Sequence, residues 1–312
     1  MSDPLVPPLA RGSLDRAAHR RTDGQWLRRA WQRARVLVVA PVDDGQALVR
    51  DAGDPELVLL PAARVPAGAE ERRLFLGVES DGTPVFAVEG ALPSVPGARA
   101  AGLREVGHLL PERDAGLLTT AVALVNWHAR HRFSPLTGRP TVATEAGWCR
   151  VDDTGHRMWP RTDPAMIVMV QDGLPGERGR CLLGNNVAWP QQPGLRRYSC
   201  LAGYVEPGES AEAAVAREVA EETGVPVTDV RYVGSQSWPF PGSLMLGYFA
   251  GADPAAPVRV DPTEIADARW FSRREIGDVL AGRRVPLEDG RDLMLPPPLS
   301  IAHFLIRRWL AD

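Results

Sequence analysis

The sequence contains no lysine, so its 36 fixed positive charges are all arginines. A lysine nucleophile or Schiff base is therefore excluded. Aspartate and glutamate number 39, and the net charge of −3 gives no overall basic field of the kind that attracts nucleic acid. An RNA could be held only at a local site.

Cysteines are few, and long apolar runs are missing. Three cysteines, Cys149, Cys181 and Cys200, are too sparse for a disulfide framework, and we expect them to be reduced and packed as small apolar residues. No run reaches the ~18 apolar residues of a membrane span, and the first 20 residues lack the apolar core of a signal peptide. We therefore expect no membrane partner and a cytoplasmic location.

The composition is that of an ordinary soluble protein, and 312 residues leave room for two domains. Residues 1–110 predict a smaller β-rich N-terminal domain, with an apolar run at Val36–Ala40 and a hairpin pattern around Ser80–Thr83. Residues 111–160 predict an amphipathic helix and an irregular polar linker over 133–159. Residues 161–312 alternate strands and helices in mixed order, which indicates an α+β fold with a mixed sheet sandwiched between helices.

The segment from Gly203 to Val225 carries the clearest chemical signal. Ser210 is a good N-cap and Gly224 a good C-terminal glycine, which predicts a helix over Ala211–Thr223. Its carboxylates at 218, 221 and 222 share one face and repel one another unless a cation lies among them. Such hard oxygen ligands suit Mg²⁺ or Mn²⁺. A solvated acidic face would explain the glutamates alone, but not the glycine, glutamate and arginine at fixed offsets around them.

These residues resemble the Nudix box, G-x5-E-x7-R-E-U-x-E-E-x-G-U, and match it at every fixed position. The resemblance implies the Nudix fold and hydrolysis of a nucleoside diphosphate linked to another group. Bound metal would screen the phosphate charge, position the phosphates and lower the pKa of water. The resemblance assigns metal binding to Glu218 and Glu222 with the carbonyl of Ala202, and leaves Glu221 as either a metal ligand or the catalytic base. It assigns structural roles to Gly203, Glu209, Arg217 and Gly224.

Ten residues further on, an aromatic and proline-rich segment reads S-Q-S-W-P-F-P-G-S. Such a segment could stack on planar bases, or it could be a structural turn with its rings packed inward. It resembles the S-Q-P-W-P-F-P-x-S motif of NADH pyrophosphatases, a branch of the Nudix family, and departs from it only at Ser237. The resemblance implies substrate contacts by Gln236, Ser237, Trp238, Pro239, Phe240, Pro241, Gly242 and Ser243.

Other segments resemble the same branch. The D-P-T-E segment at 261–264 implies a further metal-binding residue, Glu264. Further substrate contacts are implied for Tyr204, Trp159, Ile167, Ala302 and Arg104. Members of the branch tend to be homodimers that share the active site, and we expect a homodimer here.

One departure concerns zinc. The family commonly has a four-cysteine zinc ribbon between its domains, but the two C-x-x-C positions here read Ser134-Pro-Leu-Thr137 and the stretch around Cys149–Thr154. One cysteine cannot make a four-thiolate site, so we expect a ribbon-like loop without zinc.

The predicted activity is metal-dependent hydrolysis of the diphosphate of NAD(H) to nicotinamide mononucleotide and AMP, with removal of NAD caps from RNA 5′ ends as a related activity. Two alternatives stay open. Ser237 leaves room for another nucleoside diphosphate derivative, such as ADP-ribose or a dinucleoside polyphosphate. A non-enzymatic NAD-sensing module is the second, although a sensor would be expected to have lost a box glutamate and none is lost.

Overall fold

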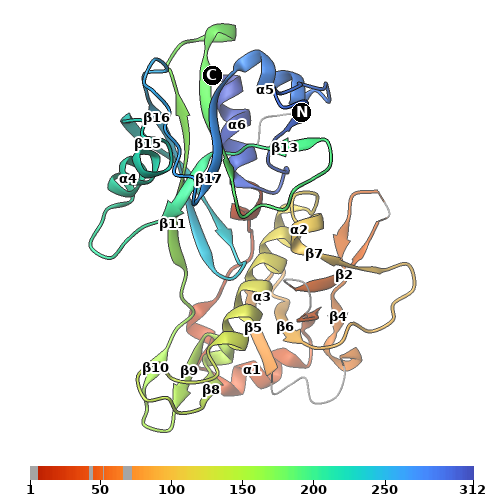
Figure 1. Cartoon of the computed structure of the whole chain (residues 1–312). Helices are drawn as coiled ribbons and strands as arrows, with labels where there is room; N and C mark the ends of the chain where they lie inside the picture. The colour runs from red at the N-terminus through yellow and green to blue at the C-terminus, as the bar shows by residue number, and fades with distance from the viewer. Residues whose placement is uncertain (1–5, 42–44, 52, 66–71) are drawn as a thin grey trace. The chain divides into compact units, whose positions relative to one another are not determined.

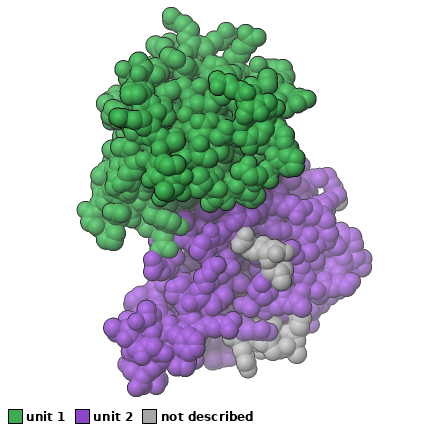
Figure 2. Space-filling view, in the orientation of Figure 1, with its two compact units in different colours: residues 1–8, 163–236, 244–312 green, residues 9–162, 237–243 purple. Residues whose placement is uncertain are grey.

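The structure is a computed structural model that describes residues 6–41, 45–51, 53–65 and 72–312. The chain forms two compact units (Figure 2). Unit 1 comprises residues 163–236 and 244–312 with residues 6–8, and unit 2 comprises residues 9–162 and 237–243. The three-part division expected from the sequence stays a prediction.

Unit 2 is rich in β-structure (Figure 1). One sheet has the order β4-β1-β6-β5 and a second has the order β3-β2-β7. Trp31, Phe75 and Phe86 interlock in the core of the first sheet, with ring centroids 5.1–5.3 Å apart. The elements are α1 (Gly24–Trp31), β1 (Arg35–Val39), β2 (Gln46–Arg50), β3 (Glu56–Leu57), β4 (Leu60–Pro61), β5 (Arg73–Val78), β6 (Pro84–Glu89), β7 (Arg99–Gly102), α2 (Leu103–Val106) and α3 (Glu112–Arg130).

The prediction of an irregular linker over residues 133–159 was wrong. This segment contains a three-stranded antiparallel sheet with the order β10-β9-β8, formed by β8 (Thr141–Thr144), β9 (Cys149–Asp152) and β10 (Arg157–Met158). We call residues 133–159 the ribbon. Its strands are two to four residues long and only half apolar, so they are too short for period-2 alternation or apolar content to reveal them.

A buried carboxylate, Asp152, ties the two turns of the ribbon together. Thr137 of the first turn donates its hydroxyl to Asp152 Oδ2 at 2.6 Å. On the second turn, Asp152 Oδ1 accepts the backbone N–H of Thr154 at 3.0 Å and of His156 at 2.9 Å, and the Thr154 hydroxyl at 2.7 Å. These hydrogen bonds, led by those from Thr137 and Thr154, hold the pKa of the Asp152 carboxyl well below its usual range. Hydrogen bonds thus join the turns where the four-cysteine ribbon described above would place its thiolates, and the donors present do not suit zinc.

Unit 1 is a sheet with helices on both faces, which confirms the α+β prediction. The sheet order is β15-β16-β11-β12-β17, with β14 paired to β11, and a small β13-β18 pair lies outside it. Alternate residues of β11 enter two different cores, one shared with α4 and the other with α6. The elements are β11 (Asp163–Gln171), β12 (Arg180–Asn186), β13 (Leu195–Arg197), β14 (Leu201–Tyr204), α4 (Ala211–Thr223), β15 (Thr228–Trp238), β16 (Ser243–Gly251), β17 (Ile265–Ser272), α5 (Arg273–Leu280), β18 (Asp292–Met294) and α6 (Ile301–Ala311).

Helix α4 begins and ends where its capping residues predict. The Ser210 hydroxyl accepts the N–H of Ala213 at 3.1 Å, and Gly224 closes the helix with φ of 70°, a left-handed conformation that favours glycine. Across the described residues, α4 and the other helices are all too short or too polar to cross a membrane.

We predict that Asp152→Asn lowers the melting temperature by several degrees at neutral pH, because the amide nitrogen cannot accept the Thr137 hydroxyl. A carboxyl with a lowered pKa stabilises the fold fully above its ordinary value and loses that contribution as the pH falls towards the lowered one. The difference from the unsubstituted protein should therefore be constant above about pH 5 and shrink below about pH 4. Thermal unfolding followed by circular dichroism measures it.

The matched control is Asp153→Asn, since the exposed Asp153 carboxylate pairs with Arg139 at the surface. Equal melting temperatures for the two variants would contradict the role of Asp152. One tightly held zinc per chain in elemental analysis would contradict the account of the ribbon as a whole.

Candidate active site

The acidic face of α4 packs against β14 at Gly203, where any side chain would displace a carboxylate. A Cβ atom at Gly203 would lie 2.0 Å from the carboxyl carbon of Glu218. Glycine at this position therefore lets the Glu218 carboxylate lie directly on the strand backbone. In the sheet, the neighbouring Ala202 pairs with Ile167 of β11. The predicted carbonyl ligand and the predicted carboxylate ligand thus belong to adjoining elements.

Arg217 joins the loop before α4 to the acidic face. Its Nε and Nη2 donate to the two oxygens of Glu209 at 2.9 Å each, and Nη2 also donates to the carbonyl of Tyr204 at 3.0 Å. Its Nη1 lies 2.9 Å from Glu221 and 3.0 Å from Glu218. This pairing, above all with Glu209, raises the pKa of Arg217 and lowers the pKa of the Glu209 carboxyl. The predicted structural roles of Arg217 and Glu209 thus have a geometric basis.

Glu222 is the most constrained carboxylate of the group. Its side chain is 3% exposed, and its buried Oε2 has no hydrogen-bond partner among the described residues. Burial, followed by repulsion from Glu218 and Glu264, raises the pKa of Glu222 to about 8. Burial also raises the pKa of Glu218. An acceptor without a donor in a crowd of negative charge is an arrangement that a bound cation would stabilise.

The chain's donors fit a hard divalent cation in type, although the carboxylates do not yet converge. Within the described part of the chain, no three acidic, histidine or cysteine side chains meet at one point as a ready metal site. Arg217 pairs with Glu218 and Glu221, so these two carboxylates are turned towards its guanidinium. The charge of Glu264 contributes to the raised pKa of both Glu218 and Glu222, and a cation would draw the three side chains together.

The predicted substrate residues of unit 1 differ in exposure. Tyr204 is 57% exposed, as a stacking residue should be. Ile167, Gln236 and Ala302 are buried, and Gln236 donates Nε2 to the carbonyl of Leu299 at 3.0 Å. Gln236 therefore fixes the chain just before α6, the helix that contains Ala302.

The aromatic loop, residues 237–243, belongs to unit 2 although it joins β15 to β16. Trp238 and Phe240 meet edge to face, with centroids 5.1 Å apart. The Arg104 guanidinium lies 3.8 Å from the Phe240 centroid and 5.2 Å from that of Trp238. The structure thus brings Arg104, predicted from a separate segment, to this loop. The other predicted substrate residue of unit 2, Trp159, is 59% exposed.

Asn126 of α3 was not predicted from the sequence. Its Nδ2 donates to the carbonyl of Pro239 at 2.7 Å and so positions the aromatic loop. The available signal was weak, an amide among the largely apolar residues of a helix.

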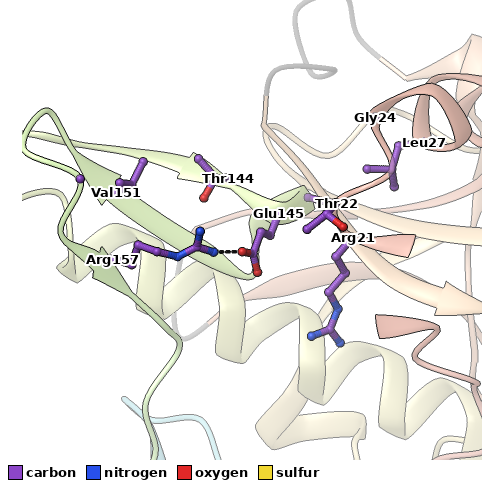
Figure 3. A pocket seen from close by; sticks show the side chains of 10 residues that line it. Arg21, Thr22, Gly24, Leu27, Thr144, Glu145, Val151 and Arg157 are labelled. Atoms are coloured by element: carbon purple, nitrogen blue, oxygen red, sulfur yellow. Dashed lines mark ion pairs between the residues drawn. The ribbon is translucent and has the colours of Figure 1, made fainter. Parts of the chain in front are cut away.

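Unit 2 also has an open pocket between the start of α1 and the ribbon (Figure 3). Its charged groups are already engaged, because Glu145 pairs with Arg157 and the Arg21 guanidinium lies 3.6 Å from the Trp148 ring centroid. The pocket contains none of the predicted site residues. It is lined by Arg21, Thr22, Gly24, Leu27, Thr144, Glu145, Ala146, Val151, Gly155 and Arg157.

Comparison with known proteins gives two matches to family models. A NUDIX domain covers residues 160–289, and an NADH pyrophosphatase-like rudimentary NUDIX domain covers residues 33–127. The chain is 41% identical to the NAD-capped RNA hydrolase NudC of Mycobacterium tuberculosis, over 98% of this chain and 95% of that protein. It is 39% identical to the human NAD-capped RNA hydrolase NUDT12, over 64% of this chain and 43% of that protein.

Among solved structures, the chain is similar to a NUDIX hydrolase from Clostridium perfringens. The two are 13% identical with a TM-score of 0.35, and the match covers 48% of this chain and 97% of the other.

We predict that Glu222→Gln lowers kcat at saturating metal by at least about a hundredfold, since a single electrostatic group in an active site contributes about 3 kcal/mol. The substitution keeps the shape of the side chain, so the fold should survive. Steady-state kinetics measure the loss, with Glu212→Gln on the exposed face of α4 as the matched control. A variant that keeps more than about a tenth of kcat would contradict the role of Glu222.

Glu222→Gln, which should lower kcat, should at the same time raise the free energy of unfolding of the metal-free protein. In the metal-free protein the raised pKa means that folding retains a proton on Glu222 between pH 4.5 and about 8, so stability falls as the pH rises through this range. Glutamine removes this dependence. Metal-free Glu222→Gln should therefore be more stable than the unsubstituted protein at pH 8–9, on the order of 2–4 kcal/mol. Urea unfolding in the presence of a chelator measures this difference, and a less stable variant would contradict the electrostatic account.

Proposed function

This chain belongs to the Nudix hydrolases, in the group that contains the NAD-capped RNA hydrolases, and we propose that it hydrolyses the diphosphate of NAD(H) and of NAD caps on RNA. The products would be nicotinamide mononucleotide, oxidised or reduced, and AMP or a 5′-monophosphorylated RNA. The single observation that carries the proposal is the complete acidic face of α4, with a buried Glu222 oxygen that lacks a partner. A sensor module would not need to retain this strained group.

We call Glu218, Glu221, Glu222 and Glu264 the acidic cluster, and each has a proposed task. Glu218, Glu222 and Glu264 would hold Mg²⁺ or Mn²⁺ together with the Ala202 carbonyl. The ions would supply charge screening for the diphosphate and a lowered pKa for water. Arg217 keeps the loop and helix in register, and Gly203 leaves the space that the Glu218 carboxylate fills. The exposed Glu221, held by Arg217, is either a further ligand or the group that takes the proton from water.

The aromatic loop would bind one of the two ring systems of the dinucleotide. Trp238 and Phe240 offer ring faces and edges, and Arg104 adds a cation beside them. Tyr204, Ile167 and Ala302 would contact the rest of the substrate. We also infer from the family a homodimer that shares its active site and a cytoplasmic location. Light scattering in solution tests the first of these.

We predict that the protein with Mg²⁺ or Mn²⁺ converts NADH and NAD⁺ to a mononucleotide and AMP. The kcat/KM should be at least about tenfold higher than for ADP-ribose, which lacks the second ring and so loses one stacking contact. Chromatography of the products from NADH, NAD⁺, ADP-ribose and diadenosine polyphosphates measures this. A chelator should abolish all turnover.

Three outcomes would point elsewhere. A preference for ADP-ribose or for a diadenosine polyphosphate would replace the proposed substrate and keep the chemistry. Binding of NAD without turnover at any metal concentration would favour a sensor. Cleavage that persists in the Glu222→Gln variant would show that the acidic cluster is not the reaction centre.

A further inference from the structure

The loop between β12 and β13 leaves the sheet beside the last predicted metal ligand. We call residues 187–194 the β12–β13 loop. The last residue of β12, Asn186, pairs with Ile265, and the N–H of Val187 donates to the carbonyl of Glu264 at 2.9 Å. The loop therefore begins on the backbone of the predicted ligand Glu264, in the same unit as the rest of the acidic cluster.

This loop is held at both ends and presents Trp189. Near its start, the N–H of Ala188 donates to the Asn186 side chain at 2.8 Å. Towards its end, Arg291 donates to the Gln191 side chain at 3.2 Å, and the carbonyl of Gly194 accepts the N–H of Asp292 at 2.9 Å. Pro190 and Pro193 restrict the backbone between these points. Trp189 is thus a partly exposed ring on an ordered support.

Arg197 lies beside Trp189, with its guanidinium carbon 5.7 Å from the ring centroid. It forms no ion pair with any described residue, and its buried Nε has no hydrogen-bond partner. The preceding residue shows the contrast, because Arg196 lies 3.0 Å from Asp289 and 3.6 Å from Asp267. Arg197 as a whole is only half-buried, so its guanidinium carries a charge that no described carboxylate balances and that a ligand anion would balance.

The Arg197 side chain does not enter the core that the sheet shares with α6. Tyr198 and Cys200 enter that core, whereas Leu201 enters the core shared with α4. Side chains of an extended chain alternate, so Arg197 projects away from the α6 core. Arg217, which contacts the acidic cluster directly, is already committed to Glu209, Glu218 and Glu221. Arg197 is consequently a cation beside the loop that begins on Glu264, and it is available to a substrate phosphate.

We propose that Trp189 and Arg197 form a subsite for the nucleotide that follows the cap adenosine in an RNA substrate. Trp189 stacks on the base, and Arg197 binds the phosphodiester that links this nucleotide to the adenosine. The proposal rests on the proposed function, because it extends the site from NAD to capped RNA. The subsite makes one local contact with the RNA and needs no basic track along the protein surface.

Calorimetric titration with non-hydrolysable product mimics tests the subsite without turnover. The probes are AMP and the 5′-phosphorylated dinucleotide pApA, each in the presence of Mg²⁺. The unsubstituted protein should bind pApA at least about tenfold more tightly than AMP, as one charge-assisted hydrogen bond allows. Arg197→Ala should remove about tenfold of that preference, and Trp189→Ala a similar amount. Neither should change the affinity for AMP.

Arg231→Ala is the matched control, since it removes one exposed arginine of the same unit from β15. If Arg231→Ala and Arg197→Ala lose the preference for pApA to the same extent, net charge explains the effect and the proposal is overturned. An unchanged preference for pApA in Arg197→Ala, with an unchanged melting temperature, would also overturn it. If Trp189→Ala fails to fold, Trp189→Phe keeps a stacking ring and should retain most of the preference.

Turnover separates this proposal from the proposed function. Arg197→Ala should lower kcat/KM for an NAD-capped oligonucleotide about tenfold and leave that for free NAD⁺ unchanged. If the unsubstituted protein hydrolyses neither substrate, the proposed function fails while the preference for pApA can still be measured. If NAD⁺ and capped oligonucleotide lose activity equally in Arg197→Ala, the subsite proposal fails while the hydrolase remains.

Discussion

The crowding of carboxylates on one face of α4 is the constraint on which the active site of this protein depends. Glu218 and Glu222 are buried against a strand, with Glu264 near enough to add to the repulsion. Negative charge at this density and burial must either be balanced by cations or be removed by protonation. Arg217 provides one, but its fork is shared among the loop and two other glutamates. The remaining imbalance falls on Glu222, whose raised pKa and oxygen without a partner among the described residues are the basis for the proposed metal site.

The S-Q-S-W-P-F-P-G-S segment is divided between the two units. Its first residues lie in β15 of unit 1, where Gln236 is buried and fixes the chain ahead of α6. Its aromatic part belongs to unit 2, where Arg104 and Asn126 hold it. A proline at position 237 would restrict the chain at the point where these two parts meet. With Ser237 there, the ordering of the loop rests on contacts from α2 and α3 instead.

The sequence predicted α4 to the residue, because Ser210 and Gly224 act locally and the box glutamates sit at fixed offsets between them. It could not predict the strands of the ribbon. Their short polar stretches are held by Asp152, whose partners come from a turn 15 residues away as well as from its own. The sequence also could not predict the close approach of Glu218 to Gly203, because that approach depends on how a helix packs on a strand. Capping and motif spacing are local information, whereas the partners of a buried polar atom are set by the tertiary fold.

Because the chain has no lysine, the fixed positive charges of unit 1 are all guanidinium groups, and their acceptors can be compared. A guanidinium has a planar fork of donors, and a buried one is stable when that fork meets carboxylates or carbonyls. Arg217 meets four acceptors, and Arg196 pairs with two aspartates. Arg197 meets an aromatic face and has a buried donor with no acceptor. Arg273 and Arg307 of the same unit also bury an Nε without an acceptor among the described residues, so the buried donor alone does not single out Arg197. The neighbouring Trp189, in the loop that begins on Glu264, is what makes a phosphate of the substrate the counter-ion that best suits Arg197.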